Sequence, residues 1–143
     1  MALADIKADS VRAAAESLGP QAIAVQTDVT KQDSIDAGFA EVVARFGHLD
    51  ILINNAALFT AAPVEEVTRA DYDRVIAVNM TGVFFCMQAA AKHMIAGGKG
   101  GKIINMASQA WRRGEPPAPP RLRCNRPEFR PLRRDAEFPR NNG

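Results

Sequence analysis

The chain has 143 residues, which is enough for one domain and too few for two. Hydrophobic residues make up 47% of it and charged residues 24%, so the composition is that of an ordinary globular protein with material for a core. The net charge of +2 averages two unlike regions, because residues 111–143 hold nine arginines against four acids, whereas residues 1–110 hold nine basic residues against twelve acids.

The first predicted elements are a strand, a helix and a second strand. Residues 2–6 are typical of the end of a strand, and an alanine-rich helix is predicted after them. Asp9 and Ser10 are the expected N-caps of this helix, and Gly19 is expected to end it. The apolar run that follows predicts a second strand over residues 22–28.

A longer amphipathic helix is predicted next. Thr30 and Asp33 have the spacing of a capping box at its start. Gly47 fits the position just past its end, where a left-handed backbone is favoured. Its apolar side chains recur at helical spacing and define one face, which consists of Ile35, Phe39, Val42, Val43 and Phe46.

The middle of the chain contains a strand and a long helix. Residues 49–54 form a nearly continuous apolar run, which predicts a strand buried on both faces. Thr68 and Asp71 mark the start of a helix that extends to about residue 95. A break in this helix is expected near Asn79 and Gly82.

A last strand is predicted over residues 102–107, after a cluster of glycines, and the apolar periodicity vanishes after Ala110. The alternation of strands and helices predicts an α/β fold with a parallel sheet. In such sheets ligands bind at the carboxyl ends of the strands. Each polar residue found there could instead serve in a turn or a helix cap, but their common placement favours a shared site. These residues are Asp5, Asp28, residues 54–57 and Ser108.

Four segments resemble the successive signatures of the short-chain dehydrogenase/reductases, in the family's order and at its spacing. Within the family, residues 104–115 are most similar to the bacterial sorbitol/polyol dehydrogenase branch, and the resemblance covers residues 1–115. The four segments are residues 27–30 (Thr-Asp-Val-Thr), 54–57 (Asn-Asn-Ala-Ala), 78–82 (Val-Asn-Met-Thr-Gly) and 101–108 (Gly-Lys-Ile-Ile-Asn-Met-Ala-Ser).

The resemblance implies a site for NAD. Asp5 matches the acid that binds the adenosine ribose hydroxyls, and a carboxylate there favours NAD because it repels a 2′-phosphate. Asp28 and Val29 match the adenine contact. Asn55 and Ala56 match the stretch that lies along the nicotinamide ribose, with an alanine next in the chain where the family has a glycine.

The resemblance also implies catalytic positions, two of which hold unexpected residues. Asn79 matches the residue that helps hold a water-linked proton relay, and Ser108 matches the serine that hydrogen-bonds the substrate oxygen. The family's tyrosine and lysine positions hold Arg121 and Asn125, and an arginine cannot replace a phenol as a proton donor. The only tyrosine, Tyr72, has no lysine four residues further on.

The family's fold is a doubly wound Rossmann sheet with strand order 3-2-1-4-5. This chain resembles the family from the end of its second strand, so the first strand, the glycine-rich phosphate loop and the strands after the fifth are expected to be missing. We therefore expect one strand pair over residues 2–6 and 22–28, separated from another over residues 50–54 and 102–107. Unpaired edges between them predict poor folding of the chain by itself.

Two regions of different character are thus expected. Residues 1–110 are interpreted as a partial dinucleotide-binding Rossmann domain. Residues 111–143 form an Arg/Pro-rich tail, which predicts disorder or a frameshifted segment. Nucleic-acid binding by this tail is disfavoured, because prolines interrupt it, it contains no known motif and the body is acidic.

Two functions follow from the resemblance. The first is an NAD(P)-dependent oxidoreductase that converts an alcohol or polyol to a ketone, in a chain that is catalytically defective because it lacks the tyrosine–lysine pair and the phosphate loop. The alternative is an inactive fragment that binds a partner, with the helices over residues 31–46 and 69–95 packing against an intact relative in a homo- or hetero-oligomer.

The remaining signals concern metals and membranes. Cys86 and Cys124 form neither a metal-ligand spacing nor a disulfide framework, so no metal is expected, and Cys86 reads as a small buried hydrophobe. We find no apolar run near the ~20 residues of a membrane span and no signal-peptide core. The sequence therefore predicts a cytoplasmic protein without a membrane-bound part.

Overall fold

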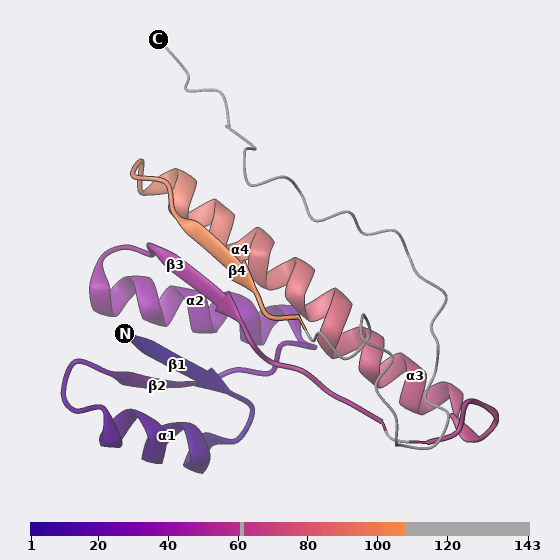
Figure 1. Cartoon of the computed structure of the whole chain (residues 1–143). Coiled ribbons are helices and arrows are strands. Elements are labelled where there is room, and N and C mark those ends of the chain that lie inside the picture. Colours follow the sequence, from indigo (N-terminus) through magenta and orange to yellow (C-terminus); the bar gives the residue numbers. More distant parts are fainter. Residues whose placement is uncertain (61, 108–143) are drawn as a thin grey trace, which may run out of the picture.

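A computed structural model describes residues 1–60 and 62–107 of the chain. The predictions for the tail and for Ser108, Arg121 and Asn125 lie outside these residues. Strands and helices alternate in the order expected of an α/β chain (Figure 1). The described strands are β1 (Ala2–Asp5), β2 (Ile23–Gln26), β3 (Ile51–Asn54) and β4 (Lys102–Asn105). The described helices are α1 (Ala8–Ser17), α2 (Gln32–Phe46), the short 3-10 turn η1 (Val64–Glu66), α3 (Arg69–Ile76), the π-helical segment η2 (Ala77–Gly82) and α4 (Val83–Ala96).

The described strands form two separate parallel sheets of two strands each. β1 pairs with β2, with Asp5 opposite Gln26, and β3 pairs with β4, with Asn54 opposite Asn105. Within the described part of the chain, no strand joins β1 to β3. The predicted separation into two strand pairs is therefore confirmed.

The start of α1 differs from its prediction. Lys7 is the N-cap, with an extended backbone, and neither Asp9 nor Ser10 caps the helix because both lie inside its first turn. The Lys7 N–H donates to Asp5 Oδ1 at 2.8 Å. This turn at the end of β1 brings the chain into the helix at Ala8, before the predicted caps are reached.

The start of α2 also differs, because the predicted capping box of Thr30 and Asp33 is wrong. The N-cap is Lys31, which has an extended backbone and no side-chain capping bond. The Thr30 hydroxyl donates to Asp28 Oδ1 at 2.6 Å instead. A hydrogen bond to a carboxylate is stronger than one between neutral groups, so Asp28 holds the hydroxyl that would otherwise cap the helix.

The rest of α2 agrees with its prediction. Ile35 is only 2% exposed. Phe39 packs against the buried cluster that contains Ile35. Gly47 ends the helix with φ of 78°, a left-handed backbone conformation that favours glycine. Its N–H donates to the carbonyl oxygen of Val43 at 2.8 Å.

The core lies between α2 and α4. Ile35 of α2 packs with Cys86 and Ala89 of α4, and all three side chains are buried. Burial raises the pKa of the Cys86 thiol, so the neutral form is favoured. Four partly buried hydrophobic residues from the surrounding elements complete the cluster, namely Val29, Phe39, Leu52 and Phe85.

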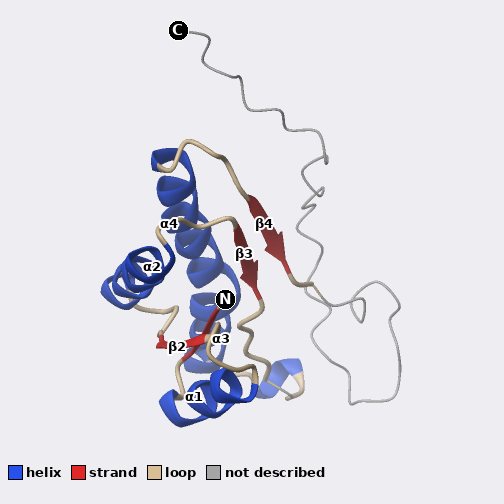
Figure 2. Ribbon diagram, turned by 90° about the vertical axis from the view of Figure 1, so that its left-hand side faces the viewer, coloured by secondary structure: helices blue, strands red, loops and turns tan. Residues whose placement is uncertain are grey.

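The predicted strand over residues 49–54 is not buried on both faces. Leu52 packs against the core, whereas Ile51 and Ile53 are 53% and 57% exposed. Successive side chains of a strand point to opposite faces, and only the Leu52 face is covered in the described part of the chain. Figure 2 shows the reason, because α2 and α4 lie together on one side of β3 and β4.

The long helix begins where the sequence predicts and then continues without a break. Thr68 is its N-cap and its hydroxyl accepts a hydrogen bond from the Asp71 N–H at 3.1 Å. The predicted break near Asn79 and Gly82 is wrong, because the π-helical segment η2, which contains both residues, joins α3 to α4 in one continuous helix. The helix Arg69–Ala96 is also long and apolar enough to cross a membrane by length and composition, which corrects the expectation that no such run exists. α4 packs against α2 and β3, and 22% of the most apolar window of this helix is buried.

Thr27, directly after β2, lies against Gly38 of α2. Its side chain is buried, and its Oγ1 has no hydrogen-bond partner among the described residues. Gly38 of α2 faces it, because a Cβ atom placed on Gly38 would come within 2.7 Å of Thr27 Oγ1. A buried hydroxyl without a partner destabilises the folded state.

Replacing Thr27 by valine is therefore expected to stabilise the protein. The Thr27→Val variant keeps the shape of the side chain and removes the unsatisfied group, so the free energy of unfolding should rise by about 1 kcal/mol. Urea unfolding followed by circular dichroism measures the change. Thr27→Ser, which keeps the hydroxyl and loses the methyl group, is the control and should be less stable than wild type. A Thr27→Val variant less stable than wild type would contradict the prediction.

Candidate functional site

The predicted site residues lie at the carboxyl ends of the described strands. Asp5 ends β1, Asp28 follows β2 by two residues, and Asn55 and Ala56 follow β3 directly. In Figure 1 the arrowheads of β1 and β3 point toward the same side of the molecule, so both sheets present these ends on that side. The structure therefore gathers the acids and the asparagine-containing loop on one edge.

The Asp5 carboxylate is oriented by the backbone N–H of Lys7, and the side chain is exposed to a ligand. Its Oδ1 accepts the Lys7 N–H at 2.8 Å, while Oδ2 has no partner in the described part of the chain. The Gln26 side chain donates to the carbonyl oxygen of Ile6 at 3.2 Å, which fixes the loop that follows the acid. An exposed carboxylate oriented in this way can accept hydrogen bonds from two neighbouring hydroxyl groups of a sugar.

Asp28 organises the loop after β2. Its Oδ1 accepts the Thr30 hydroxyl at 2.6 Å and the Thr30 N–H at 3.0 Å, and its Oδ2 lies 3.5 Å from Lys31 Nζ. The Asp28 N–H in turn donates to Ser34 Oγ at 2.9 Å. The hydrogen bond from the Thr30 hydroxyl lowers the pKa of Asp28 most, and the Thr30 N–H and the Lys31 charge lower it further, because all three stabilise the ionised carboxylate.

Asn79 clamps the loop after β3. Its Oδ1 accepts the Leu58 N–H and its Nδ2 donates to the Leu58 carbonyl oxygen, both at 2.8 Å. The π-helical segment η2 places the side chain there, and such segments are often found at functional sites. Both ends of the Asn79 amide are thus committed to Leu58, whereas the relay role expected for this residue stays a prediction.

Asn54, one of the polar residues predicted at this edge, pairs with Asn105, which the sequence did not single out as a site residue. Asn54 Nδ2 donates to Asn105 Oδ1 at 2.9 Å, across the last paired residues of β3 and β4. Asn105 Nδ2 also lies 3.3 Å from Met87 Sδ of α4. The signal was present, because each asparagine ends an apolar strand, but only the strand register brings the two together.

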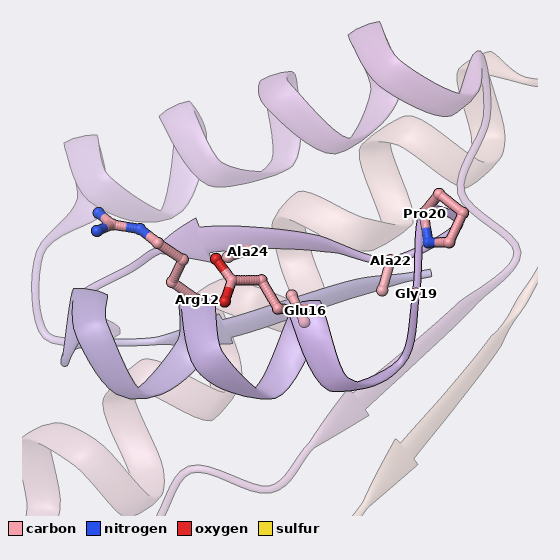
Figure 3. Close-up of a pocket in the computed structure, with 7 residues that line it drawn as sticks. Arg12, Glu16, Gly19, Pro20, Ala22 and Ala24 are labelled. Atoms are coloured by element: carbon pink, nitrogen blue, oxygen red, sulfur yellow. The ribbon is translucent and has the colours of Figure 1, made fainter.

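No group of three or more His, Cys, Asp or Glu residues in residues 1–60 and 62–107 could bind a metal ion. An open hollow lies along α1, the turn after it and β2 (Figure 3). Its lining of small residues with Arg12 and Glu16 contains no nucleophile and no pair of acids.

Comparison with known proteins identifies the family of the chain. The short chain dehydrogenase family model matches residues 1–119. The chain is 58% identical over 115 residues to the sorbitol dehydrogenase of Cereibacter sphaeroides, covering 80% of this chain and 45% of that protein. It is 49% identical over 113 residues to the galactitol 2-dehydrogenase of Agrobacterium fabrum (strain C58 / ATCC 33970), covering 79% of this chain and 44% of that protein.

Solved structures show the same fold. The structure of a short-chain type dehydrogenase/reductase from Mycobacterium marinum has a TM-score of 0.75 at 28% identity, covering 81% of this chain and 48% of that one. A 3-ketoacyl-(acyl-carrier-protein) reductase from Brucella melitensis, complexed with NADH, has a TM-score of 0.74 at 28% identity, covering 80% and 49%. The chain thus spans about half the length of the proteins it matches.

The lowered pKa of Asp28 predicts a specific response to acid. Because the folded-state pKa lies below the ordinary value, the stability that Asp28 contributes is present above that value and is lost as the pH falls through the folded-state pKa. Thr30→Val removes the strongest of the bonds that lower it, so the pKa of Asp28 should rise toward the ordinary value. The Asp28 carboxyl carbon, titrated by NMR between about pH 6 and about pH 2, reports the change.

The same substitution should also weaken the dependence of stability on pH. Urea unfolding at about pH 6 and about pH 3 should show a smaller loss of stability on acidification for Thr30→Val than for wild type. Thr81→Val, at an exposed threonine of η2, is the control and should leave the Asp28 titration unchanged. An unchanged titration in Thr30→Val would show that the hydroxyl does not stabilise the carboxylate.

Proposed function

Because the chain belongs to the short-chain dehydrogenase family, we propose that it is an NAD-linked oxidoreductase chain for the conversion between a polyol or similar secondary alcohol and a ketone. The similarity to a sorbitol dehydrogenase and a galactitol 2-dehydrogenase supports a polyol as the substrate. The observation that carries the proposal is the exposed Asp5 carboxylate at the end of β1, on the same edge as Asp28 and the loop after β3.

The donor set at this edge fits a nicotinamide dinucleotide. Asp5 offers a free carboxylate oxygen for the hydroxyls of the adenosine ribose, and its negative charge disfavours a 2′-phosphate. Asp28 and Val29 would hold the adenine, while Asn55 and Ala56 would lie along the nicotinamide ribose. NAD, when bound, supplies the ring that accepts a hydride from the alcohol carbon. The NADH complex of the Brucella melitensis reductase supports a nicotinamide cofactor.

The residues at the family's catalytic positions indicate that this chain lacks dehydrogenase activity. Ser108 would orient the substrate oxygen and Asn79 would support a proton relay, but Arg121 and Asn125 occupy the positions of the proton-transferring pair. Since an arginine holds its proton far above neutral pH, no group there can accept and return the proton of an alcohol. We therefore infer that the chain does not turn over sorbitol or galactitol, and NADH formation followed at 340 nm would contradict this inference.

A change at Asp5 tests the cofactor. Wild type is expected to bind NAD more tightly than NADP, and Asp5→Ser should narrow this preference by about tenfold because the charge that repels the 2′-phosphate is gone. Isothermal titration calorimetry with both nucleotides measures the two dissociation constants. Glu41→Ser, at an exposed acid in the C-terminal half of α2, makes the same change in net charge and should leave the preference intact.

Two results would overturn the cofactor proposal. An unchanged preference in Asp5→Ser would show that this carboxylate does not select the nucleotide. Failure of the wild-type chain to bind either nucleotide would remove the proposed function from this chain, whatever its relatives do.

A second candidate function rests on the long helix. Four large apolar side chains of α3, η2 and α4 are exposed, including Phe84 at 56% and Ile95 at 79%. Met80 and Phe84 are four residues apart and are therefore neighbours on one face of the helix, where adjacent exposed apolar side chains favour contact with a partner. This favours an inactive subunit that packs its long helix against an intact relative. The four side chains are those of Tyr72, Met80, Phe84 and Ile95.

Co-purification with a defined relative tests the second function. We expect the chain, co-expressed with tagged Cereibacter sphaeroides sorbitol dehydrogenase, to co-elute with it in size-exclusion chromatography. Phe84→Glu should reduce co-elution at least severalfold, because it places a charge in the contact. Ala14→Glu, which adds the same charge to the exposed side of α1, should not. Separate elution of the wild-type chain would contradict this function.

A further inference from the structure

The π-helical segment η2 contacts the loops that follow both sheets. Asn79 bonds to both backbone groups of Leu58, in the loop after β3. Gly82, three residues further along, packs against Val29 in the loop after β2. One turn of helix thus touches the two segments that the proposed function assigns to the two ends of a dinucleotide.

The contact at Gly82 leaves no room for a side chain. A Cβ atom on Gly82 would lie 2.7 Å from the carbonyl oxygen of Val29, 3.0 Å from its Cγ2 and 3.1 Å from its Cβ. The nearest of these atoms belongs to the backbone, so it cannot turn away as the end of a flexible side chain could. Any other residue at this position would push the Val29 peptide out of its place.

The rest of the loop cannot easily absorb such a shift. Asp28, directly before Val29, is tied to Ser34 of α2 through its N–H and to Thr30 through its carboxylate. Movement of the Val29 carbonyl would therefore strain or break the bonds that orient Asp28. A glycine within a helix costs about 1 kcal/mol relative to alanine, which favours an explanation from this close approach.

We propose that Gly82 is a positioning residue that seats the Val29 backbone on η2 and so orients the adenine-binding loop. The π-helical segment then holds that loop, through Gly82, and the loop after β3, through Asn79, at a fixed separation. This matters because no strand of the described residues joins the two sheets. The choice of ligand rests on the proposed function, whereas the seating of the loop does not.

The experiment compares Gly82→Ala with Ala90→Gly. Ala90 is fully buried on the same helix and lies outside the core cluster that contacts Val29. Removing its methyl group therefore weakens the packing of the helix without changing a contact to the loop after β2. The first readout is amide hydrogen exchange at Asp28, whose N–H is bonded to Ser34. The second is binding of 5′-AMP and of nicotinamide mononucleotide, which report the two ends of the site separately.

Gly82→Ala should speed exchange at Asp28 by about tenfold more than in the middle of α2, and it should weaken 5′-AMP binding by about tenfold. Binding of nicotinamide mononucleotide should change by less than about twofold, since the Asn79–Leu58 bonds remain. Ala90→Gly should change exchange at Asp28 and in α2 alike and affect both nucleotides equally. The same uniform pattern in Gly82→Ala would overturn the proposal by reducing Gly82 to a merely structural role.

Two further results keep the proposal separate from folding and from the cofactor. If Gly82→Ala does not fold, Val29→Ala trims the side chain that faces Gly82 without adding a clash, and the same selective rise in Asp28 exchange is expected. Normal Asp28 exchange in a folded Val29→Ala variant would then overturn the proposal. If wild type binds neither nucleotide, the proposed function fails for this chain, and the exchange measurements still decide the role of Gly82.

Discussion

The packing of α4 against α2 determines how the two halves of this structure sit together. Each sheet has only two strands, and within the described residues no backbone ladder connects them. The contact is made by the buried cluster of Ile35, Cys86 and Ala89, reinforced where η2 meets the loops at Val29 and Leu58. Because side chains rather than a continuous sheet hold the two parts in place, the geometry of the candidate site depends directly on this helix pair.

The described helices leave strand edges and apolar side chains uncovered. Within residues 1–60 and 62–107 each of the four strands has one unpaired edge, and unpaired edges favour association with other chains. Ile51 and Ile53 are exposed beside one such edge, and Phe84 is exposed on the long helix. The loops at the carboxyl ends of the strands are better bonded, since Asp28 bonds within the loop after β2 and Asn79 bonds to Leu58 in the loop after β3. The site is thus built from well-bonded loops on a core with open surfaces.

Topology could be predicted from this sequence better than local detail. The separation of the strand pairs followed from the family's strand order, whereas the break expected near Asn79 and Gly82 is a π-helical segment within one continuous helix. The predicted caps were wrong because α1 already begins at Ala8, before Asp9 and Ser10, and because Asp28 binds the Thr30 hydroxyl that was expected to cap α2. An apolar run does not reveal which faces of a strand are covered, so the exposure of Ile51 was also missed.

The proposed function requires that the carboxyl ends of both strand pairs form one nucleotide site. The most direct test is a titration of the isotopically labelled chain with NAD, followed by backbone amide chemical shifts. We expect saturable changes in the amide chemical shifts of Asp5, Asp28 and Asn55, with a common dissociation constant. Shifts that cluster instead around the hollow at Arg12 and Glu16, or that are absent throughout, would contradict it.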